Sequence, residues 1–235
     1  NVLFDDDTYQ GTVVKLGKSF SNITLLDKET IIAGTAASQK KVSEFAKNNN
    51  ISGLEFMSCI PGSIGGGIRM NSGCFKKEFK DILISIQLVD FNGLVRSIPA
   101  NKINFNYRSI ELPKDLIFLS ATLKGKKKNS EQISKYMNEL NKIKNMAQPT
   151  KIKTSGSTFK NPINQTDKKV WELIRASVDN EISYGDAVIS KKHANFFVNK
   201  KNAKSDDMKS LINFVKKKVK DQTGIKLELE IVVVE

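Results

Sequence analysis

Two segments of the chain combine residue types and spacings that could do chemistry. The first, at residues 60–73, reads Ile-Pro-Gly-Ser-Ile-Gly-Gly-Gly-Ile-Arg-Met-Asn-Ser-Gly. Closely spaced glycines let the backbone run against a flat or anionic ligand and direct N–H groups toward phosphate oxygens. The spacing matches neither the dinucleotide fingerprint of the doubly wound fold nor a P-loop. A tight structural turn is the alternative, and we favour ligand contact over it because Asn71 adds a polar side chain.

The second segment, at residues 155–162, reads Ser-Gly-Ser-Thr-Phe-Lys-Asn-Pro. A serine held directly after glycine, with Lys160 and Asn161 just beyond, could donate a proton or bind a polar ligand. The flanking residues differ from those of a nucleophile elbow, and no Ser-His-Asp arrangement is indicated. Taken alone, the segment is also consistent with ordinary turn chemistry.

The elements that must position these segments can be read from hydrophobic periodicity and turn residues. Before residue 148 the pattern predicts strands at 12–16, 30–33 and 116–123, a helix after the capping residue Ser38, and a hairpin at 82–98 that turns at Asn92-Gly93. In the first strand of the hairpin, the alternating apolar residues are Ile82, Ile84, Ile86 and Leu88, which predicts that they share one face. Ser130 is expected to cap a longer helix whose inward residues are Ile133, Met137, Leu140 and either Ile143 or Met146. Pro149 ends that helix.

A second region follows, with its own alternation of helices and strands. It holds a helix around 170–174, a strand at 195–199, a helix from Ser205 to a C-cap at Gly224, and a closing strand at 227–234. One face of the helix that begins at Ser205 is apolar and should be buried: Met208, Leu211, Ile212, Val215 and Val219. The expected fold is therefore α+β with two lobes and a cleft between them.

Composition excludes several classes of function. The 235 residues carry a net charge of +13, but the excess is almost entirely Lys, which indicates a solvated surface more than a nucleic-acid partner. One His and two Cys offer no metal-ligand spacing. No apolar run reaches the roughly 18 residues of a membrane helix. The acidic opening without an initiator Met is not a signal peptide, and it suggests that upstream sequence is missing.

Several segments, in order along the chain, resemble the UDP-N-acetylenolpyruvoylglucosamine reductase (UDP-N-acetylmuramate dehydrogenase) family. They are Gly-Leu-Glu-Phe at 53–56, Ile-Pro-Gly-Ser-Ile-Gly-Gly at 60–66, Met-Asn-Ser-Gly at 70–73, Asn-Tyr-Arg at 106–108, Gly-Ser-Thr-Phe-Lys-Asn-Pro at 156–162, Ser-Lys-Lys-His-Ala-Asn-Phe at 190–196 and Leu-Glu-Leu-Glu at 227–230. Any one could arise by chance. The ordered set, which spans almost the whole chain, is a specific match.

The resemblance implies a fold and an activity. The fold would be two-lobed α+β, with an FAD-binding domain of the vanillyl-alcohol-oxidase/UDP-N-acetylmuramate dehydrogenase type and a smaller α+β substrate-binding domain. Expected ranges are 1–8 for a remnant of the N-terminal FAD-binding subdomain, 9–147 for the FAD-binding domain, 148–224 for the substrate-binding domain and 225–235 for a C-terminal strand that returns to the FAD-binding region. The activity would be NADPH-dependent, FAD-mediated reduction of the enolpyruvyl ether of UDP-N-acetylglucosamine to UDP-N-acetylmuramate. The protein would be a cytoplasmic monomer that serves peptidoglycan synthesis, and with it cell shape and division, without a metal, nucleic-acid or membrane partner.

The resemblance also assigns roles to individual residues. Arg108 and Glu230 would stabilise negative charge that builds on the substrate carboxylate, and Ser157 would donate the proton. Contacts with FAD are implied for Asn1, Pro61, Gly62, Ser63, Gly65, Gly66, Asn71 and Gly73, and contacts with the UDP-sugar for Tyr107, Lys160 and Asn161.

Each assignment has a rival. Arg108 could be a surface ion-pairing residue, and Glu230 could belong to a solvated edge strand together with Glu228. Small changes from the family pattern surround the expected flavin site: Cys59 replaces Gly, Ser72 and Cys74 replace Ala, and Phe75-Lys76 replaces Tyr-Gly. The glycines of the family's flavin pyrophosphate loop, which precede Asn1 in the pattern, are not in this chain. A catalytically impaired flavin- or nucleotide-binding protein on the same scaffold is therefore the alternative function.

Overall fold

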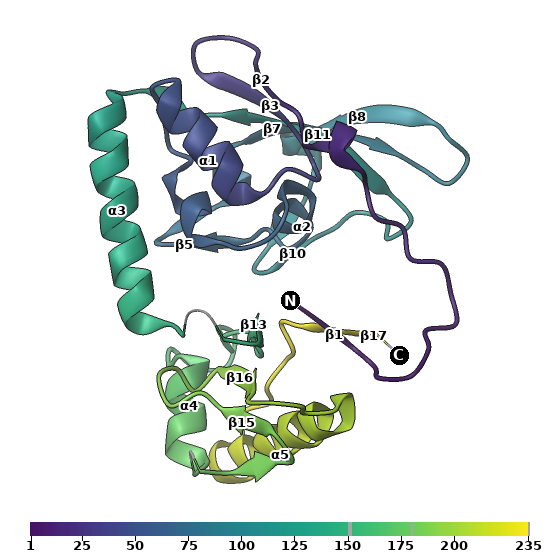
Figure 1. The fold of residues 1–235 in the computed structure, drawn as a ribbon, viewed down its shortest axis with the longest axis vertical. Helices are drawn as coiled ribbons and strands as arrows, with labels where there is room; N and C mark the ends of the chain where they lie inside the picture. Colours follow the sequence, from purple (N-terminus) through teal and green to yellow (C-terminus); the bar gives the residue numbers. More distant parts are fainter. Residues whose placement is uncertain (150–151, 180, 235) are drawn as a thin grey trace. The chain divides into compact units, whose positions relative to one another are not determined.

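The computed structural model describes residues 1–149, 152–179 and 181–234, which form two compact units (Figure 1). The central unit is Val13–Lys144, and the terminal unit joins Asn1–Thr12 to Asn145–Glu235. Each unit has its own hydrophobic core and is described by itself. Among the described residues, no helix is both long and apolar enough to cross a membrane.

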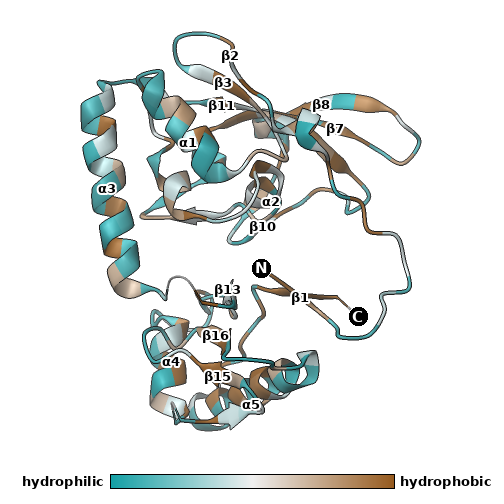
Figure 2. Ribbon diagram, viewed as in Figure 1, coloured by the Kyte–Doolittle hydropathy of each residue, from teal (hydrophilic) through white to brown (hydrophobic). Residues whose placement is uncertain are grey.

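The central unit is built on a five-stranded antiparallel sheet in the order β2-β3-β11-β7-β8. These strands are β2 (Ile23–Leu25), β3 (Thr30–Gly34), β7 (Leu83–Val89), β8 (Val95–Pro99) and β11 (Ile117–Lys124). Helices α1 (Gln39–Asn48) and α2 (Ile64–Arg69) cover one face of the sheet, and hydrophobic residues follow its strands (Figure 2). Burial of these apolar side chains from both layers holds the unit together.

Short elements connect this sheet and its helices. They include four 3-10 turns, η1 (Lys18–Ser21), η2 (Glu55–Cys59), η3 (Phe79–Asp81) and η4 (Ala100–Lys102). Three two-stranded pairs are also present: β4 (Ile51–Ser52) with β12 (Lys126–Lys127), β5 (Gly73–Cys74) with β6 (Lys77–Glu78), and β9 (Phe105–Asn106) with β10 (Ser109–Ile110). The last two pairs carry much of the candidate site.

Most of the elements predicted in the central unit are confirmed. Helix α1 has Ser38 as its N-cap, with Ser38 Oγ accepting a hydrogen bond from Lys41 N. The 82–98 hairpin forms, and Gly93 supplies the positive φ, +83°, that its turn requires. The strand predicted at 12–16 is wrong, because those residues are exposed backbone outside any sheet.

Two side-chain orientations also differ from the prediction. Ile84 is exposed and Leu83 is buried, because a β-bulge where β7 pairs with β11 shifts the alternation of β7. In α3 (Ser130–Ala147), Ile143 and Met146 are exposed, although the inward positions up to Leu140 are correct. The cap of α3 is Asn129, whose Oδ1 accepts a hydrogen bond from Glu131 N at 2.8 Å, and not Ser130.

The terminal unit packs two helices on a four-stranded antiparallel sheet in the order β13-β16-β15-β14. The strands are β13 (Thr154–Ser157), β14 (Ser183–Tyr184), β15 (Ala187–Ile189) and β16 (Phe196–Asn199), and the helices are α4 (Val170–Ser177) and α5 (Ser205–Thr223). The predicted buried face of α5 is confirmed, and Gly224 ends the helix with φ +74°. The helix begins at Ser205, as predicted, and Lys204 is its N-cap residue.

The two ends of the chain meet in the terminal unit. β1 (Val2–Phe4) pairs in parallel with β17 (Val232–Val234), so Val2 lies opposite Val232. The regular strand therefore covers only the last three residues of the strand predicted at 227–234. Before it, Leu229 forms an isolated bridge with Phe159. The functional labels given to residues 1–8, 9–147, 148–224 and 225–235 stay predictions.

Candidate functional site

In the glycine-rich segment, backbone N–H groups at the start of α2 donate to protein acceptors. Ile64 N donates to Ala37 O and Gly65 N to Thr35 O, each at 2.9 Å. Ser63 caps the helix by accepting from Gly66 N at 3.2 Å. A ligand at this segment would therefore find these three N–H groups already engaged, and contact would come from the exposed surface of the backbone.

The glycines of the segment fall into two groups. A Cβ on Gly67 would lie 2.4 Å from the Phe79 ring, and one on Gly73 would lie 2.2 Å from Lys77 O, so packing alone excludes a side chain there. Gly66 is exposed, and a Cβ there would meet only the Ser63 hydroxyl, at 3.4 Å. Gly62 is exposed too, but its φ of +112° disfavours any side chain. Gly62 and Gly66, next to exposed Pro61 and half-buried Ser63, are the glycines that packing leaves open to a ligand.

The residues beside this segment fit a bound FAD. Gln39 Nε2 lies 3.4 Å from Ser63 O, whereas Gln39 Oε1 is buried and has no hydrogen-bond partner in the described part of the chain. Ser72 Oγ is likewise buried without a partner there. A polar cofactor that carries hydroxyl and amide groups could satisfy such atoms, whose desolvation otherwise costs about 1–3 kcal/mol each.

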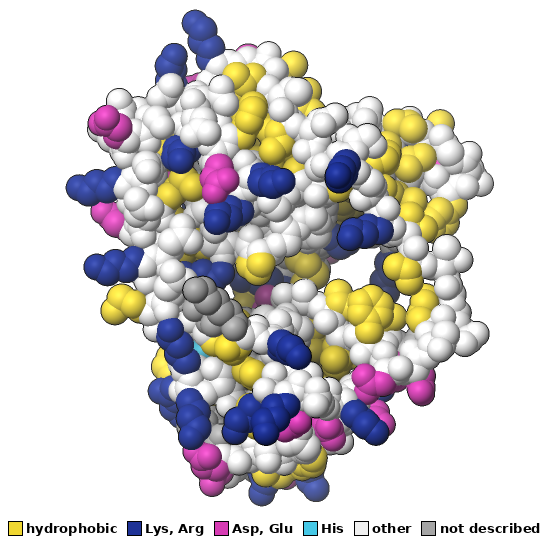
Figure 3. Space-filling view, viewed as in Figure 1, with side chains coloured by type: hydrophobic (Ala, Val, Ile, Leu, Met, Phe, Trp, Pro, Cys, Tyr) yellow, Lys and Arg dark blue, Asp and Glu magenta, His cyan; other side chains and the backbone are white. Residues whose placement is uncertain are grey.

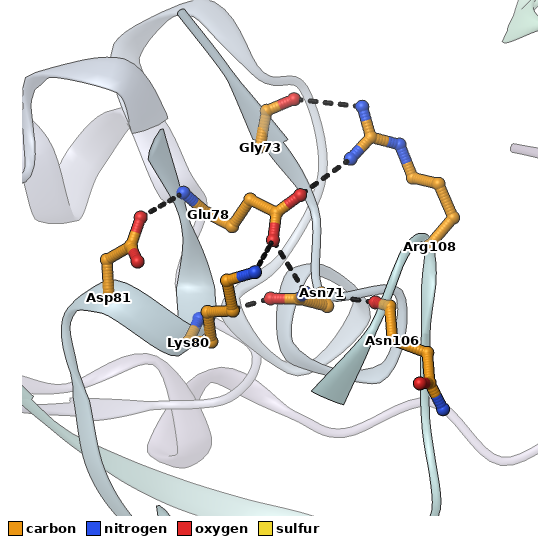
Figure 4. Close-up of polar contacts among 7 residues, drawn as sticks. All are labelled: Asn71, Gly73, Glu78, Lys80, Asp81, Asn106 and Arg108. Carbon is orange, nitrogen blue, oxygen red and sulfur yellow. Dashed lines mark hydrogen bonds and ion pairs between the residues drawn. The ribbon is translucent and has the colours of Figure 1, made fainter. Parts of the chain in front are cut away.

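Asn71 holds together the elements around the second half of the segment (Figure 4). Its side chain is completely buried, and its Nδ2 donates to Glu78 Oε2 at 3.0 Å and to Asn106 O at 3.1 Å. Its Oδ1 accepts from Lys80 N at 3.1 Å. The amide predicted to contact FAD thus uses both donors on the protein, which makes it a structural residue first.

Arg108 lies in the turn between β9 and β10, and its φ is +58°. An arginine in this left-handed region costs roughly 1–3 kcal/mol, a strain that concentrates at functional sites. Its guanidinium donates from Nη2 to Gly73 O at 3.1 Å, and Nη1 lies 4.0 Å from Glu78 Oε1. It also lies 4.9 Å from the centre of the Tyr107 ring. The side chain is 18% exposed, which argues against the simple surface ion-pair reading.

The two cysteines lie together next to this cluster. Cys74 Sγ is 3.4 Å from Phe56 O, and both thiols are free. Hydrogen bonding from Cys74 lowers the pKa of Cys59 to about 6, and the same contact together with burial raises the pKa of Cys74. Cys59 is buried, and Cys74 is half-buried.

In the terminal unit, Asn195 fixes the segment that contains Ser157. Its Oδ1 accepts from Phe159 N at 2.9 Å, and its Nδ2 donates to Phe159 O at 2.8 Å. Asn195 O accepts from Thr158 N at 2.8 Å. This buried residue was missed as a functional candidate, although a polar side chain between the apolar Ala194 and Phe196 was a usable signal.

Backbone pairing places Glu230 next to the serine segment. Glu230 N donates to Thr158 O at 2.9 Å, so that Glu230 lies opposite the residue after Ser157. Glu230 is half-buried, whereas the side chain of Glu228 is 76% exposed, so the two acidic residues do not share one solvated face. The structure therefore places the segment that contains Ser157 beside the segment that contains Glu230, although the two are distant in the sequence.

Asn1 lies at the same place. Asn1 O accepts from Val232 N at 2.9 Å, two residues beyond Glu230. Gly156 has a φ of +89°, and a Cβ on it would approach Asn1 Oδ1 to 2.8 Å. One residue predicted to contact FAD and two predicted catalytic residues thus share one region of the terminal unit, while Arg108 and Tyr107 belong to the central unit.

The other predicted residues of the terminal unit also make protein contacts. Lys160 Nζ lies 3.8 Å from Glu228 Oε2, and Asn161 Oδ1 accepts from Val170 N at 3.0 Å at the start of α4. His193 packs edge-on against Phe196, and burial lowers its pKa. Within the described ranges, no three His, Cys, Asp or Glu side chains are grouped to hold a metal ion.

The surface carries Lys side chains on both units and shows no single basic stripe on the face drawn in Figure 3. Acidic side chains are interspersed among them. This distribution agrees with the interpretation of the positive charge as a solvated surface.

Comparison with known proteins identifies the family. The model of the FAD binding domain matches residues 1–98, and the model of the UDP-N-acetylenolpyruvoylglucosamine reductase C-terminal domain matches residues 148–234. Over 231 residues the chain is 62% identical to the UDP-N-acetylenolpyruvoylglucosamine reductase of Pelagibacter ubique (strain HTCC1062) and 43% identical to that of Rickettsia bellii (strain RML369-C). Each match covers 98% of this chain and 76% of the relative.

A solved structure agrees. The crystal structure of UDP-N-acetylenolpyruvylglucosamine reductase from Thermus caldophilus matches with a TM-score of 0.80 and 28% identity, over 94% of this chain and 77% of the other. The family and the two-lobed α+β fold predicted from the sequence are thereby confirmed. The chain belongs to the UDP-N-acetylenolpyruvoylglucosamine reductase family and is an FAD-dependent oxidoreductase.

Proposed function

We propose that this protein reduces the enolpyruvyl ether of UDP-N-acetylglucosamine to UDP-N-acetylmuramate, with NADPH as the co-substrate and FAD as the bound cofactor, in the synthesis of peptidoglycan precursors. The observation that carries the proposal is the pairing of Glu230 N with Thr158 O, which brings the acidic residue beside Ser157. A module that only bound a nucleotide would have no need for a serine and an acidic residue on two adjoining segments.

FAD, when bound, supplies the hydride. Its polar groups would be held by the exposed backbone at Gly62 and Gly66, with Gln39 Oε1 and Ser72 Oγ as the buried atoms that await a partner. Asn1 would contribute from the terminal unit. In this role the protein orients the cofactor and excludes water from it.

The chain's own residues handle the substrate's charge and proton. Addition of hydride to the vinyl carbon builds negative charge on the enolpyruvyl carboxylate. Arg108 would stabilise that charge with a fixed cation, and Glu230 would add a hydrogen bond from its carboxyl group. Ser157 would then donate its hydroxyl proton to the neighbouring carbon.

The substrate nucleotide would contact Tyr107, Lys160 and Asn161. Because Lys160 and Asn161 follow Ser157 within one loop, binding of the UDP-sugar there would bring its ether close to the proton donor. We further propose that the protein acts as a monomer in the cytoplasm.

An absorption experiment tests the function. The purified protein is reconstituted with FAD, treated anaerobically with NADPH and then given the enolpyruvyl UDP-sugar. Bleaching of the flavin band by NADPH and its recovery with the sugar are expected. Bound flavin that bleaches without recovery would favour the alternative, a catalytically impaired flavin-binding protein. The observation that favours this alternative is the presence of Cys59 and Cys74, which depart from the family pattern, beside the cluster.

A further inference from the structure

The guanidinium of Arg108 is held by the β5–β6 hairpin, whose two register partners, Gly73 and Glu78, both face it. Gly73 offers its carbonyl oxygen at 3.1 Å and Glu78 offers Oε1 at 4.0 Å (Figure 4). The two acceptors lie opposite each other across one hairpin, and they contact two different nitrogens of the same planar group. One hydrogen bond and one longer ion pair on different nitrogens limit the orientation of the guanidinium as well as its position.

The Glu78 carboxylate is itself anchored from both sides. Its Oε2 accepts from Asn71 Nδ2 at 3.0 Å and lies 3.0 Å from Lys80 Nζ. Its backbone N donates to Asp81 Oδ2 at 2.9 Å, within a capping box at η3. The side chain is only 22% exposed, so the carboxylate has a defined place in the fold.

The Glu78 carboxylate lies at different distances from its two cationic neighbours, Lys80 and Arg108. Lys80 Nζ is at the distance of a charge-assisted hydrogen bond, whereas Arg108 Nη1 at 4.0 Å is well beyond it. The hydrogen bond to Glu78 also raises the pKa of Lys80, which keeps that ammonium charged. Lys80 therefore lies closer to the Glu78 carboxylate than Arg108 does, so Glu78 contributes more to the placement of Arg108 than to the neutralisation of its charge.

Strain in the same hairpin supports a positioning role. Phe75 and Lys76, which form its turn, have φ values of +53° and +62°, and neither is a glycine. Arg108 and Asn71 also have positive φ. Backbone strain of this kind persists only where the surrounding contacts impose it. The Asn71–Glu78–Arg108 contacts are the ones that tie these strained turns together.

We propose that Glu78 is a positioning residue, which orients Arg108 toward the carboxylate of the substrate while Lys80 offsets its charge. The inference rests on the proposed function, because it assumes that Arg108 meets a carboxylate. Glu78 acts through Arg108 and would itself touch neither the substrate nor FAD.

Ligand binding to the FAD-loaded protein tests this without turnover. Two nucleotides are titrated by calorimetry, UDP-N-acetylmuramate, which carries the carboxylate, and UDP-N-acetylglucosamine, which lacks it. Glu78→Ala should weaken binding of the first by about 10-fold to 100-fold, the range that a hydrogen bond to a charged group supports, and should leave the second unchanged. Equal weakening of both nucleotides would show a general structural defect and would overturn the proposal.

A double-mutant cycle asks whether Glu78 works through Arg108. If it does, Glu78→Ala should add little to the loss already caused by Arg108→Ala. Additive losses would contradict the proposal. Glu78→Gln keeps an acceptor for Asn71 and serves as a second variant if the alanine variant fails to fold. It should also lose affinity for UDP-N-acetylmuramate and not for UDP-N-acetylglucosamine, and the loss should be smaller.

Two further variants separate the possible failures. Glu111→Gln is the matched control, because Glu111 accepts from Asn104 and Asn106 at 2.8 Å in the neighbouring β9–β10 hairpin, and it should change neither affinity. Arg108→Ala alone tests the underlying function. If Arg108→Ala still prefers UDP-N-acetylmuramate to UDP-N-acetylglucosamine, the proposed role of Arg108 fails. If Arg108→Ala loses this preference and Glu78→Ala keeps it, the positioning role of Glu78 fails and the proposed function stands.

Discussion

The glycine-rich segment of the central unit and the serine segment of the terminal unit are held in place by opposite means. Residues 60–73 are shaped by missing side chains, since Gly67 and Gly73 pack so closely that no Cβ fits. Residues 155–162 are shaped by polar partners, with Asn195 bound to both backbone groups of Phe159 and residues 228–230 paired alongside. The first segment exposes backbone at Gly62 and Gly66, and the second carries the candidate side chains Ser157, Lys160 and Asn161. The comparison teaches that substitutions should fail in different ways in the two segments.

The largest effect is expected at Ser157. If the serine segment exists to present a proton donor, Ser157→Ala should slow reoxidation of the flavin by the UDP-sugar about 1000-fold, the scale of general acid catalysis. Reduction of the flavin by NADPH should keep its rate. Stopped-flow absorbance measures both half-reactions, and Ser155→Ala on the same strand is the control. Equal losses in the two half-reactions would remove Ser157 from the role of proton donor.

Next comes the polar support of that segment. Asn195→Ala leaves the buried N–H and C=O of Phe159 without partners and should lower the free energy of unfolding by about 3 kcal/mol. Denaturant unfolding measures the loss. Asn199→Ala is a matched control, because Asn199 makes the same double contact with Ala203 at a less buried site, and the loss should be smaller. A larger loss at Asn199 would contradict the argument from burial.

The glycine-rich segment can be tested by adding one methyl group at two adjacent positions. Gly67→Ala forces a Cβ against the Phe79 ring and should lower the free energy of unfolding by about 2 kcal/mol. Gly66→Ala, in the same helix with open space around it, should keep or slightly raise stability. Only Gly66→Ala should weaken FAD binding without loss of stability, measured by fluorescence titration. Unchanged affinity in that variant would argue against flavin contact at Gly66.

The smallest effect concerns the anchor of β1, which carries Asn1 to the serine segment. A hydrogen bond from Lys209, at 2.7 Å, lowers the pKa of Asp5 from 3.8 to about 2. Because the folded pKa lies below the unfolded one, the stabilisation is full above about pH 3.8 and is lost as the pH falls toward 2. Thermal unfolding of the wild type and of Asp5→Asn should therefore converge over that interval. A constant difference in melting temperature down to pH 2 would be inconsistent with this ion pair.

The elements of both units were largely predictable, because they depend on local patterns. The α5 face that buries Leu211 and Val215, the turn at Gly93 and the C-cap at Gly224 each follow from spacing within one element. The errors lie where tertiary contacts override local patterns. Ile84 points outward because a bulge in the pairing with β11 shifts the strand, and Ile143 is exposed because α3 runs beyond the core that covers its first turns.

Ordered motifs and hydrophobic periodicity were enough to predict the family, the order of the elements and the candidate residues, because these patterns can be read without knowledge of contacts. The neighbours of each candidate, and its contribution to the fold, became known from the tertiary contacts. Backbone pairing over some seventy residues placed Glu230 beside Ser157, while burial showed Asn71 to be a support and Gly73 a packing glycine. The physical reason is that a hydrogen bond or a steric clash depends on distance in space, which sequence spacing does not encode beyond one element.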